Sequence, residues 1–239
     1  MMGNTHRVSK AFILRINSPK SIEYAQCAAD SCDAVGLDWK YFDGYSHMSG
    51  KDAWSLTGIE MRWPTVEPVT PHFIYEPPEH YKAECASAGH AAIWKKIVDG
   101  PDECVIILEH DAIMLHSLDI EVPDYKIAVL GYKIKNPERY DHESAGPTTE
   151  WVDIDGHEGA HAYALTKTTA QFLLDEIDQS GILGQIDNAY FIRRQRRTQI
   201  PLILASPTSA LGWLRESTIW TESSTANYGF IDSFDRFYK

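Results

Sequence analysis

The sequence lacks any long uninterrupted apolar run. No segment approaches the ~18 consecutive apolar residues that a membrane-spanning helix requires. The apolar stretch near the N-terminus, AFIL, is also too short for the core of a signal peptide. We therefore predict a cytoplasmic protein.

Cysteine is scarce and forms no recognisable pattern. Cys27, Cys32, Cys85 and Cys104 include no C-x-x-C pair and no spacing typical of a zinc site. This argues against a zinc-binding module and against a disulfide framework. The spacing favours reduced, mostly buried thiols.

Positive charge is in deficit. Lys and Arg number 22 against 34 Asp and Glu, so the net charge is −12. A field of this sign argues against non-specific binding to nucleic acid or to anionic membranes. The exception is a local cluster in the segment 193–197, which holds four arginines. Such a cluster is most simply a solvated helix end, and the alternative is a site for an anionic acceptor.

What the sequence does contain is an alternation of strand-like and helix-like segments without internal repeats. Strands are predicted at 11–17, 37–45, 105–108, 125–132 and 201–205, helices at 20–34 and 83–100, and a strand that turns into a helix at 159–178. The segment 46–81 combines prolines with aromatic residues and is predicted to be an ordered, irregular insertion. This alternation predicts an α/β fold with a mostly parallel central sheet.

One apolar run ends in charge. In VIILEHDAIML (105–115), Glu109, His110 and Asp111 interrupt residues that suit a strand covered on both faces. Ligands in open α/β sheets bind at the carboxyl ends of strands, so the cluster lies where a site is expected. Carboxylates suit Mg²⁺ or Mn²⁺, and imidazole is acceptable to Mn²⁺. A metal, a bound ligand or an internal ion pair could each compensate the buried charge.

A different metal site is also conceivable from the same residues. His110-Asp111 could be the adjacent pair of an HD-type phosphohydrolase. Such sites gather their ligands on a helical bundle, whereas this pair ends a strand, so the sequence disfavours that class.

Longer stretches around the cluster resemble a known family. ECASAGHAAIWKKIVDGPDECVIILEHDAIM (84–114) resembles the central signature of glycosyltransferase family 25, the lipopolysaccharide-biosynthesis type. EGAHAYALTKTTAQFLL (158–174) is similar to the family's Gly-Thr-His-Ala-Tyr-x-Ile segment, and QIDNAYF (185–191) to its Pro-Ile/Val-Asp-x-x-Leu/Phe segment. YFDGY (41–45) is similar to the family's early Asp-Gly. The four matches follow the family's order over most of the chain.

The resemblance implies a single GT-A type (Rossmann-like) nucleotide-binding domain over residues 1–239, with the insertion at about 46–81. It implies transfer of a hexose from a nucleoside diphosphate sugar, most simply a UDP-hexose, to a hydroxyl of a glycan acceptor. The implied reaction inverts the anomeric centre and uses Mn²⁺ or Mg²⁺ as cofactor.

Site residues carry over by position. Glu109 and Asp111 match the outer acids of the family's triplet and are expected to contact the donor and the metal, with Asp111 joining the metal to the diphosphate. His161 matches the histidine of the later motif and is expected to be a further metal ligand. Asp187 matches the lone aspartate of the last motif and is expected to be the catalytic base, with Glu109 as the other catalytic residue. The alternative for Asp187 is a helix N-cap.

Three further residues are expected to contact the donor: Asn17, Lys20 and Asp43. The sequence also departs from the family. His110 stands where the family has its middle acid, and INSPKSIEYAQ, where the family is rich in arginine, offers Lys20 as its only cation.

Two alternative functions remain open at this point. The chain could glycosylate a hydroxylated base in DNA, a reading that the negative charge disfavours. It could also be a GT-A-like module that binds nucleotide or glycan without turnover, a reading that His110 motivates. His90, on the apolar face of the 83–100 helix, is predicted to be a core histidine bonded to a backbone carbonyl, with support of the site as its alternative role.

Overall fold

The computed structural model describes residues 3–59, 77–133, 146–157, 159–180, 186, 190–191 and 200–212. The helices in these ranges are α1 (Pro19–Ala34), α2 (Gly50–Thr57), α3 (Pro77–Asp99) and α4 (Lys167–Ser180). The central sheet contains, in spatial order, β3 (Trp39–Asp43), β2 (Lys10–Arg15), β4 (Cys104–Glu109), β10 (Ala162–Thr166), β7 (Ile127–Val129), β11 (Leu202–Ser206) and β9 (Glu150–Ile154). Two small sheets pair β1 (Thr5–His6) with β6 (Val122–Pro123), and β5 (Ala112–Met114) with β12 (Ala210–Gly212) and β8 (Gly131–Lys133).

Most strands of the central sheet point the same way. β2 is parallel to β3 and β4, and β7 is parallel to β11. β10 is antiparallel to its neighbours β4 and β7, and β9 is antiparallel to β11. Five of the seven strands (β2, β3, β4, β7 and β11) therefore share one direction. The predicted α/β class with a mostly parallel sheet is confirmed.

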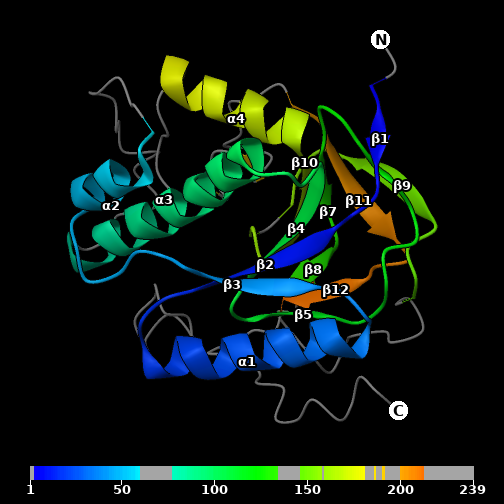
Figure 1. Cartoon of the computed structure of the whole chain (residues 1–239), viewed down its shortest axis with the longest axis horizontal. Coiled ribbons are helices and arrows are strands. Elements are labelled where there is room, and N and C mark those ends of the chain that lie inside the picture. The colour runs from blue at the N-terminus through cyan, green and yellow to red at the C-terminus, as the bar shows by residue number, and fades with distance from the viewer. Residues whose placement is uncertain are drawn as a thin grey trace.

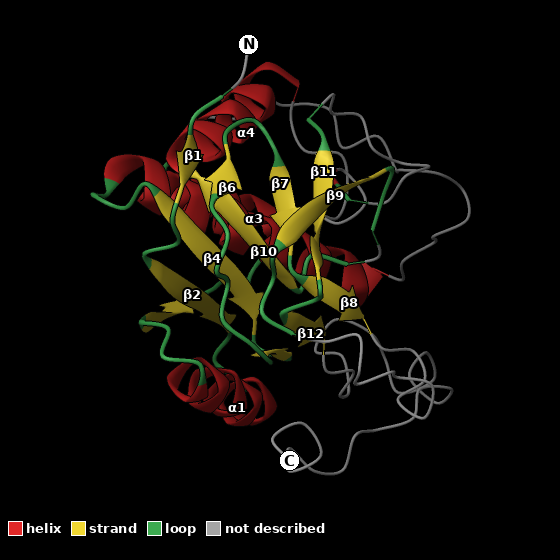
Figure 2. Ribbon diagram, turned by 90° about the vertical axis from the view of Figure 1, so that its right-hand side faces the viewer, coloured by secondary structure: helices red, strands yellow, loops and turns green. Residues whose placement is uncertain are grey.

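Helices cover both faces of this sheet because successive strand residues point to opposite sides. Figure 1 shows α1 below the strands and α3 and α4 above them, and Figure 2 shows the same layers from the side. Ala11 and Ile13 of β2 pack toward α1, whose inner face is built from alanines such as Ala25. Phe12 and Leu14 pack on the other face in the cluster that includes α3 and α4. Both faces of β2 and β4 are therefore buried, as their apolar runs predict.

The sheet has a topological switch point between β2 and β4, which is the place where successive connections run to opposite sides. The chain passes from β2 through α1 to β3 on one side, then returns through α2 and α3 to β4 on the other side of β2. The carboxyl ends of β2 and β4 therefore lie next to each other, with Leu14 opposite Glu109. A crevice at such a point is where open α/β sheets bind ligands.

The predicted insertion at 46–81 is partly helical. α2 begins after Ser49, whose hydroxyl accepts a hydrogen bond from the Asp52 amide, and ends at Gly58 in the left-handed conformation. α3 begins at Pro77, which starts this helix before the 83–100 range predicted from periodicity. The description of 46–81 as irregular was therefore wrong in these parts, and residues 60–76 lie outside the described ranges.

Other elements were not predicted at all. The predicted strand 125–132 is two strands, β7 and β8, in different sheets, and β9, β5 and β12 had no counterpart in the sequence reading. In the described part of the chain, no helix is both long and apolar enough to cross a membrane.

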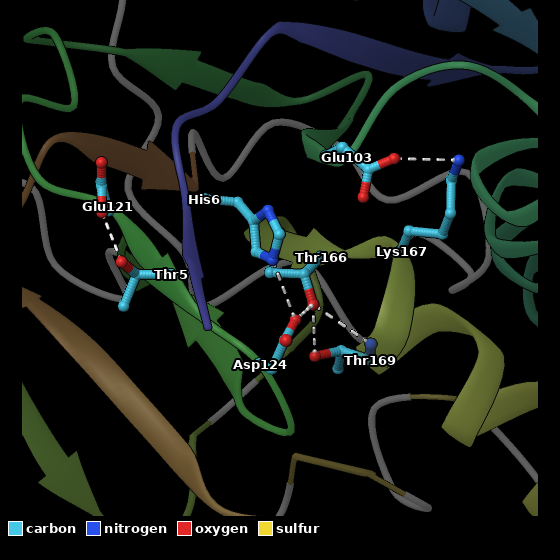
Figure 3. A network of polar contacts seen from close by, with 8 residues as sticks. All are labelled: Thr5, His6, Glu103, Glu121, Asp124, Thr166, Lys167 and Thr169. Atoms are coloured by element: carbon cyan, nitrogen blue, oxygen red, sulfur yellow. Dashed lines mark hydrogen bonds and ion pairs between the residues drawn. The ribbon is translucent and has the colours of Figure 1, made fainter. Parts of the chain in front are cut away.

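A buried polar cluster fastens the N-terminal strand at the opposite end of the sheet from Glu109. Asp124 accepts a hydrogen bond of 2.7 Å from the Thr166 hydroxyl and lies 3.4 Å from Nε2 of His6 on β1 (Figure 3). The same Thr166 hydroxyl caps the start of α4, because it accepts a hydrogen bond from the Thr169 amide. These partners satisfy Asp124 internally, so the cluster stabilises the fold.

Candidate functional site

The acidic cluster lies in the turn between two sheets. Glu109 is the last residue of β4, His110 and Asp111 form the turn, and Ala112 begins β5. The Glu109 amide donates to the carbonyl oxygen of His161 at 2.8 Å, which ties the turn to the start of β10. The Glu109 side chain remains 30% exposed, so its carboxylate reaches the edge of the sheet.

The Glu109 carboxylate contacts the buried side chain of His90. Nε2 of His90 lies 3.2 Å from Oε1 of Glu109, and its Nδ1 lies 2.9 Å from the Tyr163 hydroxyl. The predicted bond from His90 to a backbone carbonyl is therefore wrong, and the alternative, support of the site, is what the contacts favour. Gly89, the residue before His90, allows α3 to pack closely on β2, because a Cβ at this position would lie 3.2 Å from Cδ1 of Leu14.

His110 faces α1. Its ring stacks on Tyr24 with a centroid distance of 6.2 Å and an interplanar angle of 8°. Its Nε2 is buried and makes no hydrogen bond to any residue that the structure describes. A buried ring nitrogen in this state is costly unless something binds it, which is one of the marks of a ligand site.

The sequence reading missed a cation at this edge. Arg15 closes β2, its Nε lies 2.7 Å from Oδ1 of Asp43, and its guanidinium lies 3.8 Å above the Tyr41 ring. Asp43 is one of the predicted donor contacts, and here it orients Arg15 while its own side chain stays 77% exposed. Arg15 precedes the INSPKSIEYAQ segment, where the family is rich in arginine, but as the last residue of β2 it reaches the same edge of the sheet.

The other two predicted donor contacts lie where β2 passes into α1. Asn17 and Lys20 are exposed, and between them Ser18 caps the helix with its hydroxyl, which accepts from the Ser21 amide. The first turn of α1 contains no acidic residue. The amino end of this helix, with its partial positive charge, therefore lies at the switch point beside Arg15 and Lys20.

His161 is buried beside the acidic turn. The strand that follows it, β10, pairs with β4, with Ala162 opposite Leu108. Its Nε2 lies 3.3 Å from the carbonyl oxygen of Gly131, and the ring lies so close to Gly212 that a Cβ there would be 2.8 Å from it. Nε2 of His157 lies 2.8 Å from the same Gly131 oxygen.

The predicted three-residue metal centre is not assembled in this conformation. Across the described ranges, no group of three or more His, Cys, Asp or Glu side chains could hold a metal ion. Glu109, Asp111 and His161 come to one edge of the sheet, but Glu109 contacts His90 and His161 contacts a backbone oxygen.

Of the other polar and aromatic residues considered for the site, some lie outside the described residues and others lie away from the acidic turn. Asp187 and the arginines of 193–197 lie outside the residues that the structure describes. Asp153 lies on β9 at the far edge of the sheet and pairs with Lys126 at 3.0 Å. Trp151 packs against the α1-side core and donates to the Glu121 carbonyl oxygen, as expected of a packing residue.

Comparisons with known proteins give only weak likenesses. No family model matches the sequence, and no curated protein matches it. Among solved structures, a glycosyltransferase involved in the glycosylation of the major capsid of PBCV-1 is similar, with 10% identity, a TM-score of 0.39 and coverage of 87% of this chain and 94% of that one. An active-site mutant of LgtC is similar with 11% identity, a TM-score of 0.39 and coverage of 90% and 94%. Likeness at this TM-score carries no argument about activity, and membership of family 25 stays a prediction.

Proposed function

We propose that this protein is a glycosyltransferase of GT-A type that transfers a hexose from a nucleoside diphosphate sugar to a hydroxyl of a glycan acceptor. One observation carries the proposal: the acidic turn after β4 lies at the switch point of the sheet, beside Arg15 and the amino end of α1. The resemblance to family 25, read from the sequence, points to the same acidic turn.

The positive groups suit a diphosphate. Arg15 is held by Asp43 and Tyr41, so its guanidinium is oriented before any ligand arrives. Lys20 and the amide groups at the start of α1 add attraction for phosphate oxygens. Asn17 would donate a hydrogen bond to the same ligand. Together these groups would bind the part of the donor that leaves.

The acids suit a divalent cation only with help from the donor. The described residues do not fit a complete protein cage, but Mg²⁺ and Mn²⁺ are commonly held by one or two carboxylates, with substrate phosphates and water as the other ligands. Asp111 would be the protein ligand, with Glu109 orienting the ribose or a metal-bound water. When bound, the cation would neutralise charge on the leaving diphosphate. His161 would join through Nδ1, because its contact with the Gly131 oxygen uses Nε2.

The transfer step is a single displacement. The acceptor hydroxyl oxygen forms a bond to the anomeric carbon as the bond from that carbon to the diphosphate oxygen breaks. The hydroxyl proton goes to a base on the acceptor side, and we assign that role to Asp187 from its matched motif. Glu109 and Asp111 serve the diphosphate side and are not available for it.

The proposal is tested by incubating the protein and Mn²⁺ with a panel of nucleoside diphosphate hexoses, with and without glycan acceptors, and following the products by mass spectrometry. We expect release of nucleoside diphosphate from one donor and a sugar mass added to an acceptor. Asp111→Asn should abolish both, whereas Asp153→Asn, a surface acid on the far edge of the sheet, should leave both unchanged. Nucleotide binding without hydrolysis or transfer for every donor would instead indicate a binding module. Transfer only to hydroxylated bases in DNA would indicate the DNA-modifying alternative.

A further inference from the structure

A chain of buried polar contacts leads from the core to the acidic turn. Nε1 of Trp94 donates to the Tyr163 hydroxyl at 2.9 Å, this hydroxyl contacts Nδ1 of His90 at 2.9 Å, and Nε2 of His90 contacts Glu109 at 3.2 Å. Trp94, Tyr163 and His90 are fully buried, and only Glu109 reaches solvent. The sequence predicted Glu109 as a site residue and support of the site only as an alternative role for His90, and it predicted no site role for Tyr163 or Trp94.

The chemistry of these groups determines where each proton lies. The Trp94 indole can only donate, so it uses one lone pair of the Tyr163 oxygen. Burial raises the pKa of the Tyr163 hydroxyl well above its ordinary value, so the phenol keeps its proton. That proton has an acceptor in Nδ1 of His90, which leaves the ring proton on Nε2, where it points at the Glu109 carboxylate.

The other protonation states leave a buried group unsatisfied. A proton on Nδ1 alone would turn the lone pair of Nε2 toward the carboxylate oxygen, which is repulsive. A doubly protonated ring would donate to Tyr163, and the phenol proton would then lose its acceptor among these four residues. Only the neutral ring with its proton on Nε2 satisfies every contact in the chain.

The series of contacts from Trp94 to Glu109 does not conduct protons. Moving a proton outward to Glu109 would require a tyrosinate at Tyr163, which burial opposes. Trp94 cannot replace that proton, because an indole N–H is not an acid at ordinary pH. These contacts instead hold the Nε2–H group of His90 in place as a hydrogen-bond donor to Glu109.

We infer that His90 is a positioning residue for Glu109, locked by Tyr163 and Trp94 in the Nε2-protonated neutral form. It fixes the direction of one carboxylate oxygen and thereby the orientation of the Glu109 carboxylate at the switch point. The consequence for the donor rests on the proposed function, while the proton position does not.

The proton position is measured first by long-range ¹H–¹⁵N correlation spectra of the full-length protein with ¹⁵N-labelled histidine, at neutral pH. Comparison with His90→Gln identifies the His90 signals. We expect the pattern of a neutral ring protonated on Nε2. A ring protonated on Nδ1, or on both nitrogens, would overturn the inference whether or not the protein is a transferase.

The positioning role is measured with two matched substitutions. The side chain of His90→Asn ends near the position of Nδ1, so it can accept from Tyr163 but leaves Glu109 without its donor. The amide nitrogen of His90→Gln lies near the position of Nε2, so it can donate to Glu109. We expect KM for the donor to rise by ~10-fold or more in the Asn variant and to return to within about threefold in the Gln variant.

A purely structural role predicts a different result. Partial unfolding lowers the active fraction and thus the apparent kcat, and it leaves KM for the donor unchanged in both variants. If that pattern is found, His90 is a core residue only. If the wild type has the expected proton position but neither turns over nor binds UDP, the proposed function and its donor role fall together, and the proton position alone stands.

Discussion

Replacing Tyr163 with phenylalanine isolates the buried chain of contacts from the rest of the core. The substitution keeps the aromatic ring that packs edge-on against Phe191 and removes only the hydroxyl. It leaves the indole N–H of Trp94 and Nδ1 of His90 without the partner that each has at 2.9 Å. An unsatisfied buried polar group costs roughly 1–3 kcal/mol. Two such groups, less the desolvation that the lost hydroxyl no longer requires, give a decrease of about 2–4 kcal/mol in the free energy of unfolding.

The assay is urea denaturation followed by tryptophan fluorescence. Tyr125→Phe is the matched control, because Tyr125 is 53% exposed and its ring also contacts a phenylalanine edge-on. We expect the control to change stability by less than about 0.5 kcal/mol. If the two substitutions cost the same, the hydroxyl of Tyr163 does not anchor the chain, and the proton assignment at His90 loses its basis. A second variant, Trp94→Phe, should cost less in the Tyr163→Phe background than alone, because the contact is already gone.

Three further predictions test other parts of the structure. Burial raises the pKa of the Cys104 thiol to about 12, so a thiol reagent at pH 8 should label Cys104 only in denaturant. The partly exposed Cys27 should react in the folded protein, and equal labelling rates of the two cysteines in the folded protein would contradict this. Burial works to raise the pKa of Asp102, but the hydrogen bonds from Lys10 and Ser9, together with the charges of Lys10 and Lys40, outweigh it and lower the pKa. The stabilisation is therefore present above the unfolded value of about 3.9 and is lost as the pH falls through the folded value. Asp102→Asn should therefore lower stability by about 0.5–1 kcal/mol at pH 7 and leave it unchanged at pH 2, and an equal loss at both would refute the pairing. Gly131→Ala would place a Cβ 1.6 Å from a backbone oxygen of β12 and should cost at least about 2 kcal/mol in thermal or urea unfolding, and a neutral effect would contradict the strand pairing.

Local patterns in the sequence predicted the elements that flank the site. The continuous apolar run of β4 and the helical periodicity around His90 come from residues close together in the chain, and the strand and helix formed as expected. The antiparallel direction of β10 was not predictable in this way, because an apolar strand reads alike in either direction. Its direction is visible only in its pairing with β4 and β7, which lie far from it in the sequence.

The contacts within the site depend on residues far apart in the chain. His90 meets Glu109 across 19 positions and Tyr163 across 73, so its helical face alone identified it as buried but not its partners. Arg15 was overlooked for a different reason. Its place as the last residue of β2 and the pairing of that strand with β3 bring it to Asp43, and neither can be read from the INSPKSIEYAQ segment that follows it.

Isothermal titration with UDP in the presence of Mn²⁺ tests the central claim most directly, namely that the carboxyl ends of β2 and β4 bind the diphosphate of the donor. Arg15→Gln removes the oriented cation at that edge, and Lys126→Gln removes a cation in a similar surface ion pair on the far side of the sheet. We expect the first substitution to weaken UDP binding by ~10-fold or more and the second to change it by less than about twofold. Binding that is lost equally in both variants, or in neither, would contradict the placement of the donor at the switch point.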